Sequence, residues 1–143
     1  RLIRDIMRLC FLIERRYAPY AKWLGTAFKH LACGAELSPL LWQAQVASSW
    51  QAREDALCQV YEIIARLHNG LGLGQPLPAT VSAFYTRPYR VIHGGTFAHA
   101  LVEQIHDPTV QRLAHHLIGN IDQWSDNIAL EGVGRMKRRT LLE

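Results

Sequence analysis

Cysteine is scarce in this chain of 143 residues, and its distribution narrows the classes of protein that apply. The three cysteines are Cys10, Cys33 and Cys58, and no Cys-x-x-Cys pair is present. An odd number of widely spaced cysteines indicates neither a disulfide framework nor a thiolate metal site. Reduced thiols are typical of the cytoplasm, which is the expected location.

Long apolar runs are also missing. The stretch from Leu9 to Ile13 is among the longest without a charge, whereas a bilayer requires about 20 apolar residues. No membrane partner is therefore expected. Hydrophobic residues make up 49% of the chain and charged residues 20%, which predicts a single folded domain over 1–143. Because the chain opens at Arg1 inside an amphipathic pattern, we expect it to be the C-terminal part of a longer protein.

Motifs of the common catalytic chemistries are absent as well. The sequence has no Gly-x-Ser-x-Gly elbow, and the glycine-rich segment 70–74 lacks the lysine and the preceding strand of a phosphate-binding loop. His99, Glu103 and His106 share one face of an expected helix but have no fourth ligand. The sequence therefore predicts no catalytic residue, no metal site and no cofactor in this chain.

Apolar residues recur at intervals of three and four over most of the chain, which predicts an all-α fold, a bundle of about six helices. Helices are expected over 1–17, 19–31, 38–47, 48–69, 96–106 and 120–130, with a further start at Pro108. Residues 131–143 are expected to form a frayed basic tail.

Capping residues refine these limits. Gly34 is expected to terminate the second helix, and Ser38 before Pro39 to open the third. Ser48 has the spacing of a capping box and is expected to begin the fourth helix. A left-handed cap at Gly70 is expected to end it. Asp107 before Pro108 has the pattern of another helix start.

Residues 70–95 have a different composition, with five of the ten glycines and three of the six prolines. A segment of this length and composition predicts a long ordered loop, and such loops are often functional. One short strand is expected within it, at 90–92.

Positive charge is concentrated at the start of the chain, because residues 1–30 hold seven basic and two acidic side chains. This excess favours an anionic partner such as a phosphate. The densest polar and aromatic cluster in this part offers charge and stacking faces for a triphosphate or a nucleobase. Its members are Arg15, Arg16, Tyr17, Tyr20, Lys22 and Trp23. Alternatively, the aromatic rings pack the corner between two helices and the arginines are solvated.

Two further groups are weaker candidates for substrate binding. Arg87, Tyr89 and Arg90 lie in the long loop, which would supply two guanidinium groups if it folded over the same corner. In the alternative, the Pro-Tyr pair fills the core. His68 and Asn69 end the long fourth helix, where capping alone would explain Asn69. The five residues between Arg87 and His93 also match the arginine-histidine spacing of small helical ribonuclease-type domains.

The stretch from Arg4 to Phe28 contains the motif Arg-Arg-Tyr-Ala-Pro-Tyr-Ala-Lys-Trp and resembles an uncharacterised bacterial family of domains of unknown function. In that family a helical C-terminal domain follows a domain that resembles a nucleotidyltransferase. The segments 68–72 and 87–92 resemble it too, so that the similarity covers about residues 1–107.

The resemblance implies an accessory role, since the activity of the family is not established. In nucleotidyltransferases, paired aspartates hold magnesium, and an appended helical domain often supplies basic and tyrosine contacts to the triphosphate or the acceptor substrate. This chain lacks a Gly-Ser motif with paired aspartates, and the segment 122–126 does not have their spacing. Magnesium and a nucleoside triphosphate are therefore implied for the full-length protein, with the upstream domain as partner. In the alternative, the aromatic corner is a non-catalytic docking face for that domain or for a second copy in a homodimer.

Overall fold

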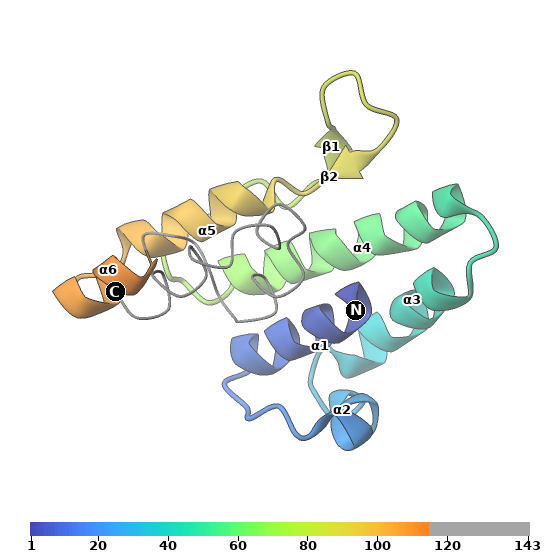
Figure 1. Ribbon diagram of the computed structural model, residues 1–143, viewed down its shortest axis with the longest axis horizontal. Coiled ribbons are helices and arrows are strands. Elements are labelled where there is room, and N and C mark those ends of the chain that lie inside the picture. The colour runs from blue at the N-terminus through green and yellow to red at the C-terminus, as the bar shows by residue number, and fades with distance from the viewer. Residues whose placement is uncertain (115–143) are drawn as a thin grey trace, which may run out of the picture. The chain divides into compact units, whose positions relative to one another are not determined.

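The computed structural model describes residues 1–114 and confirms the all-α class. Within these residues there are six helices and one small antiparallel hairpin (Figure 1). The helices are α1 (Leu2–Ile13), α2 (Ala21–Phe28), α3 (Gly34–Val46), α4 (Trp50–Asn69), α5 (Gly94–Glu103) and α6 (Pro108–Ala114). The strands are β1 (Ser82–Ala83) and β2 (Arg90–Val91). The helix expected at 120–130 and the tail expected at 131–143 lie outside the described residues.

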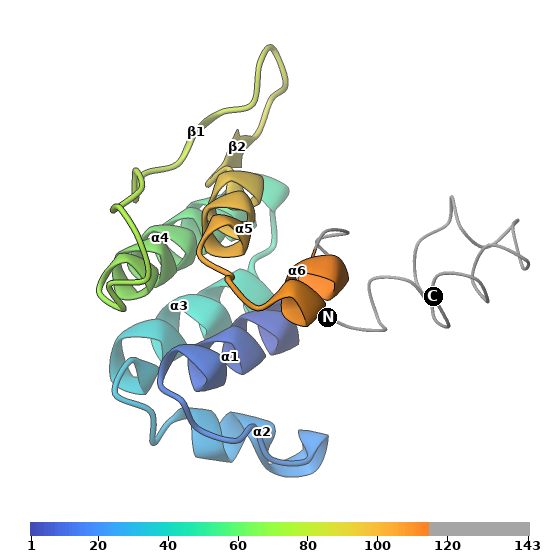
Figure 2. The same ribbon diagram turned by 90° about the vertical axis from the view of Figure 1, so that its left-hand side faces the viewer.

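The first compact unit of the chain is Arg1–Phe97, and its core is shared by α1 to α4. α3 packs chiefly against α4, and α1 lies between α2 and α4 in both views (Figures 1 and 2). Buried residues recur at helical spacing on each facing surface, so that one apolar stripe per helix closes the core. They include Ile6, Cys10 and Phe11 of α1, Leu24 and Phe28 of α2, Leu37 and Leu41 of α3, and Val60, Ile63 and Ile64 of α4.

A second unit begins at Ala98 and contains the remainder of α5 and α6 among its described residues. α6 begins at Pro108 as expected, because the side-chain oxygen Oδ1 of Asp107 accepts hydrogen bonds from the backbone N–H groups of Thr109 and Val110 at 2.8 and 3.0 Å. Among the helices of residues 1–114, none combines the length and the apolar character needed to cross a membrane.

The corner between α1 and α2 is longer than the sequence predicted. α1 ends at Ile13 instead of about residue 17, because Arg15 adopts a left-handed backbone conformation with φ of 53°. α2 begins at Ala21 instead of Pro19 and ends at Phe28 instead of residue 31. Tyr20, with φ of −51° and ψ of 147°, is extended and precedes the first helical turn. The residues between the two helices therefore form an irregular connection and not a sharp helix-to-helix turn.

The start of α3 corrects two sequence-based expectations. Gly34 does not terminate a helix but is the first residue of α3, and Pro39 lies inside the helix. The hydroxyl group of Ser38 does not cap the helix, since it donates a hydrogen bond of 2.5 Å to the carbonyl oxygen of Gly34. The local Ser-Pro pattern fails here because the N-cap is Cys33, five residues earlier, where the carboxylate of Glu14 accepts a hydrogen bond from the backbone N–H.

α4 is confirmed as the long fourth helix, but both of its predicted caps are displaced. The N-cap is Ser49 and not Ser48, and the Ser49 hydroxyl oxygen accepts a 3.1 Å hydrogen bond from the N–H of Ala52. Gly70 keeps a right-handed conformation with φ of −64°, and the left-handed glycine is Gly72 with φ of 64°. The helix therefore ends in a right-handed turn, and the reversal comes two residues later.

The long loop after α4 contains the short strand expected at 90–92, observed as β2. It pairs antiparallel with β1 in the register Ser82 with Val91 and Ala83 with Arg90. Side chains of α4 hold the loop: the amide of Asn69 bonds the backbone of Leu77 in both directions, at 2.7 and 3.1 Å. α5 then begins at Gly94, two residues before the expected start.

Two glycines on either side of the connection between α2 and α3 provide a stability test. A Cβ atom at Gly34 would overlap the carbonyl oxygen of Phe28, whereas a Cβ at Gly25, inside α2, would meet no atom within 4 Å. We expect Gly34→Ala to lower the free energy of unfolding by about 1–3 kcal/mol through steric overlap. Gly25→Ala should raise it by about 0.5–1 kcal/mol, because alanine loses less backbone entropy in a helix.

Urea denaturation of both variants checks this prediction. Equal effects of the two substitutions would contradict the close approach of Gly34 to the end of α2.

Candidate functional site

The carboxylate of Glu14 connects the end of α1 to the start of α3. Its Oε2 accepts a hydrogen bond of 3.0 Å from the N–H of Ala32, and its Oε1 accepts one of 2.9 Å from the N–H of Cys33. Cys33 is the N-cap residue of α3, so these donors belong to the turn that leads into the helix. A carboxylate is favourable here because the first N–H groups of a helix have no partner within the helix and carry partial positive charge.

These contacts change the acidity of Glu14. Burial by itself would raise the pKa of the carboxyl, but the N–H groups of Cys33 and Ala32 stabilise its charged form and outweigh burial, with a smaller contribution from Arg16. The pKa of Glu14 is therefore below its ordinary value. Glu14 is a structural anion that joins α1 to α3, and these donors stabilise its negative charge.

The connection fixed by Glu14 borders a groove between α1, α2 and α3, with a volume of about 760 Å³. Its principal lining residues are Ile3 and Met7 of α1, Lys22, Gly25 and Thr26 of α2, Lys29 after α2, and Ser38, Trp42 and Gln45 of α3. We call it the lysine groove.

The charge of the lysine groove has one sign. Its lining within the described residues includes Lys22 and Lys29 but no carboxylate. The Lys22 ammonium lies 5.5 Å from the ring centroid of Trp23, an arrangement that holds the cation near an aromatic face. Trp42 is 63% exposed although it lines the groove. The groove thus combines two cations with an accessible indole ring, which suits an anion that carries a planar or apolar group.

The aromatic residues of the predicted corner do not pack into the core. Tyr17 is 99% exposed, Tyr20 78% and Trp23 59%. Arg15 is exposed, and Arg16 is exposed with a long contact of 3.5 Å from its guanidinium to the carbonyl oxygen of His30. The alternative in which these rings fill the corner is therefore not what the structure shows. They form a solvent-facing surface that adjoins the lysine groove through Trp23 and Lys22.

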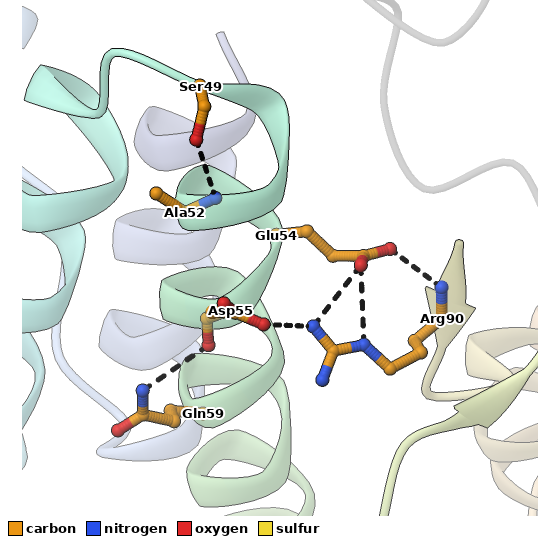
Figure 3. Close-up of polar contacts among 6 residues, drawn as sticks. All are labelled: Ser49, Ala52, Glu54, Asp55, Gln59 and Arg90. Atoms are coloured by element: carbon orange, nitrogen blue, oxygen red, sulfur yellow. Dashed lines mark hydrogen bonds and ion pairs between the residues drawn. The ribbon is translucent and has the colours of Figure 1, made fainter. Parts of the chain in front are cut away.

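Arg90 packs against α4, not against the corner (Figure 3). The Glu54 carboxylate accepts bonds of 2.7 Å from the Arg90 N–H, 3.3 Å from Nε and 3.2 Å from Nη2, and Asp55 pairs with the same Nη2. These carboxylates raise the pKa of Arg90, Asp55 first and Glu54 second. The single positive charge of Arg90 is thus paired with two carboxylates of α4, which ties the hairpin to this helix.

Of the other candidate residues in this segment, Arg87 and Tyr89 lie in the turn of the hairpin, and His93 follows β2 at its base. The Tyr89 ring stacks on Phe84 with centroids 5.6 Å apart, and the side chain of Arg87 is exposed. His93 has φ of 53°, and its Nε2 lies 2.8 Å from the Ser82 hydroxyl oxygen. None of these residues lines the lysine groove in the part of the chain that the structure describes. The hairpin residues and the corner residues therefore belong to separate surfaces.

His68 and Asn69 also have separate roles. Asn69 holds the loop at Leu77 and does not cap the helix. The ring of His68 meets that of Phe97 edge to face, with centroids 5.2 Å apart. His68 therefore lies on a different surface from the lysine groove, although residues of α1 line both sites.

Sequence reasoning found Lys22 but missed Lys29 and Trp42. Lys29 follows Lys22 by seven residues, two turns of helix, and this spacing was a usable signal. Trp42 gave no such signal, because its place in the groove depends on how α3 packs beside α2. Glu14 directly precedes the cluster that the sequence indicated, but its own partners lie 18 and 19 residues away along the chain.

The three cysteines are free and buried. Burial raises the pKa of Cys10, Cys33 and Cys58, so that their thiols stay protonated and are poor nucleophiles. Within residues 1–114, no group of three or more histidine, cysteine, aspartate or glutamate side chains is arranged to hold a metal ion.

Comparison with protein families matches residues 1–24 to the model of a domain of unknown function (DUF4037). The matched segment contains α1, the connection with Glu14 and the first turn of α2 with Lys22. No curated protein and no solved structure matches the chain. The comparisons therefore support an uncharacterised domain at this end of the chain, over the residues that build one side of the lysine groove.

The cap by Glu14 predicts a pH-dependent stability. Glu14→Gln removes the charge and one of the two acceptors, and we expect a loss of about 1–2 kcal/mol in the free energy of unfolding at pH 7. The folded-state pKa is below the ordinary value, so the stabilisation is complete above about pH 4.3 and disappears as the pH falls through the folded-state pKa. The difference in the free energy of unfolding between the native chain and the variant should therefore become smaller at acidic pH.

Urea denaturation from pH 7 to pH 3 measures this difference. Glu36→Gln is the matched control, because Glu36 is an exposed carboxylate in the first turn of the same helix. A loss as small as that of the control, or one that is constant with pH, would contradict the capping role of Glu14.

The contact between Arg90 and α4 predicts how firmly the hairpin is held. We expect Glu54→Gln to increase hydrogen exchange of the backbone amides of 82–91 by roughly tenfold, because the charge-assisted bonds to Arg90 are weakened. Gln59→Ala is the control, since Gln59 is an exposed residue of the same helix whose side chain donates a hydrogen bond to the carbonyl oxygen of Asp55 (Figure 3). Equal exchange in both variants would show that the hairpin does not depend on this ion pair.

Proposed function

We propose that this chain is the accessory, substrate-side helical domain of a nucleotidyltransferase-like protein. In this proposal the lysine groove and the adjoining corner bind the phosphate groups of a nucleotide or an anionic acceptor substrate. The chain contributes no catalytic residue, while magnesium and the nucleoside triphosphate bind between it and an upstream domain. The free, buried cysteines are consistent with a cytoplasmic location, which is part of the proposal.

The observation that carries the proposal is the charge of the lysine groove. Lys22 and Lys29 line it without a carboxylate among its described lining residues, so its two charges have no internal counter-ion there. A phosphate accepts hydrogen bonds from several ammonium groups at once, and these charge-assisted bonds are stronger than neutral ones. The exposed ring of Trp42 provides a face on which a base or another planar group can stack.

The sequence similarity also supports the proposal, because the family match covers residues 1–24 and the motif covers 15–23. Lys22 belongs to both the motif and the groove. Arg15 and Arg16 extend the positive surface along the corner, where both are exposed. The nucleotidyltransferase link itself rests on the resemblance of the sequence, and the groove supplies a physical reason for an anionic ligand.

A second candidate function is docking without catalysis, and the exposure of Tyr17, Tyr20 and Trp23 favours it. Three aromatic rings that face solvent within seven residues are typical of a protein interface, where aromatic side chains supply most of the binding energy. In this case the corner contacts the upstream domain or a second copy of the chain, and the interaction does not depend on nucleotide.

The two functions differ in their response to nucleotides. Titration of the chain with ATP, GTP, CTP and UTP, with and without magnesium, should raise the midpoint of thermal unfolding for at least one of them under the first proposal. We expect Lys22→Glu to weaken that binding by at least roughly tenfold, because a charge-assisted contact becomes a repulsion. Lys29→Glu should weaken it similarly, since Lys29 lines the same groove.

Arg66→Glu is the matched control, because it makes the same change of charge at an exposed position of α4 that does not line the groove. Equal losses of nucleotide affinity in Lys22→Glu and Arg66→Glu would show that only the net charge of the chain matters, and not the position of Lys22. The absence of any shift would contradict nucleotide binding by this chain. In that case, association with the upstream domain that is lost in a Tyr17→Ser, Trp23→Ser variant would identify the corner as a docking face.

A further inference from the structure

A second concave site lies between α1 and α4, and its chemistry is unlike that of the lysine groove. It has a volume of about 270 Å³. Three groups of residues line it: Ile6, Leu9 and Ile13 of α1; Tyr61, Ile64, Ala65 and His68 of α4; and Ile92, Gly94 and Phe97 from the segment after the hairpin. All of them belong to the first compact unit of the chain. We call this site the His68 pocket.

Helical spacing explains why these residues meet. On α4, residues 61, 64, 65 and 68 follow one another at three, one and three positions, which places them on a single face. On α1, residues 6, 9 and 13 do the same at three and four. The two helices contact each other, and Figure 1 shows α4 on the side of α1 away from α2. Two walls of the pocket are therefore regular helix faces, which hold their shape better than loops do.

The unusual feature of this pocket is His68. Both of its ring nitrogens are buried, and neither has a hydrogen-bond partner among the described residues. Phe97 fixes the ring from one side, with centroids 5.2 Å apart and an angle of 86° between the ring planes, but it offers no conventional acceptor or donor. Buried polar atoms are nearly always paired, because water is lost without replacement when they are not. His68 thus brings unused hydrogen-bonding capacity to an apolar pocket.

A single water molecule is a poor partner for His68 in this pocket. Buried waters typically make about three hydrogen bonds to polar groups. Tyr61 is the other lining residue with a polar side-chain atom, and it lies two turns, about 10 Å along the helix axis, from His68. An apolar molecule with one polar head group matches this lining better than water does.

We propose that the His68 pocket binds a small, largely apolar molecule with one polar head group, an oxygen of which bonds a ring nitrogen of His68. The body of the ligand lies against Ile6, Leu9 and Ile64, which removes apolar surface from water. With about 30 Å³ for each water-sized group, the volume suits a ligand on the order of ten non-hydrogen atoms. The head group is a hydroxyl or a carboxylate, because an imidazole can donate to or accept from the first and donate to the second.

This site is independent of the lysine groove. The groove meets α1 at Ile3 and Met7, whereas the His68 pocket meets it at Ile6, Leu9 and Ile13. No lysine or arginine lines the pocket within the described residues. Nucleotide binding and binding of an apolar ligand can therefore succeed or fail separately, and substitutions in one site leave the other intact.

The probes that test the proposal are 1-octanol and octanoate, with toluene as a ligand without a head group. We expect the native chain to bind octanol or octanoate saturably by titration calorimetry and by a rise in the thermal midpoint. The more tightly bound of the two identifies the head group. His68→Phe keeps a ring of similar size but removes both nitrogens, so it should weaken binding of the preferred probe by roughly three- to tenfold. Toluene should bind the native chain and this variant within a factor of two.

A pair of leucine substitutions provides the steric control. Leu9 lines the pocket and is 42% exposed, whereas Leu12 is on the same helix, is 72% exposed and does not line it. Because both positions are partly open to solvent, Leu9→Trp and Leu12→Trp should fold. We expect Leu9→Trp to abolish binding of all three probes by covering the pocket, and Leu12→Trp to have no effect.

Three results would overturn the proposal. The first is a folded native chain that binds neither octanol nor octanoate, and the second is unchanged affinity in Leu9→Trp. The third is equal binding of the preferred probe by the native chain and His68→Phe, which would show that the ring nitrogens do not contact the ligand. Far-UV circular dichroism of each variant confirms that the fold is retained. Nucleotide titrations of the same variants should be unchanged.

Discussion

The carboxylate of Glu14 is the contact on which the arrangement of the first three helices depends. It lies after the last turn of α1 and accepts hydrogen bonds from Ala32 and Cys33, immediately before α3. Its charge is stabilised where the unpaired N–H groups of a helix start are concentrated. With α1 and α3 joined in this way, α2 is held in the loop between them. The lysine groove is the space that these three helices enclose.

The first unit of the chain thus carries two concave sites of opposite character on different faces of α1. The lysine groove combines Lys22 and Lys29 with an exposed indole ring, whereas the His68 pocket is apolar apart from Tyr61 and His68. α1 contributes apolar residues to the core and also lines both sites. The ligand chemistry proposed for each site differs: an anion for the lysine groove, and an apolar molecule with one polar head group for the His68 pocket.

Sequence patterns predicted the helices well where a long apolar stripe was present and less well where a short capping pattern was the evidence. α4 followed from its stripe, but Ser49 replaced Ser48 as its cap, and α3 began at Gly34 and not at Ser38. Of the candidate site, Lys22 was identified from its cluster, while Trp42 was not. Arg90 was expected to bind a phosphate, and the structure shows its guanidinium paired with Glu54 and Asp55, 36 and 35 residues away.

The sequence by itself determined the helical class, the approximate positions of the helices, the excess of positive charge in the first 30 residues and the hairpin strand near Arg90. These properties depend on residues close together in the chain, and local spacing records them. Four features depended on tertiary packing: the start of α3, the partner of Arg90, the joining of Lys22 with Trp42 in one groove, and the burial of the His68 ring nitrogens. They arise from contacts between helices that no local pattern encodes, because a capping carboxylate or a facing side chain can come from any distance along the chain.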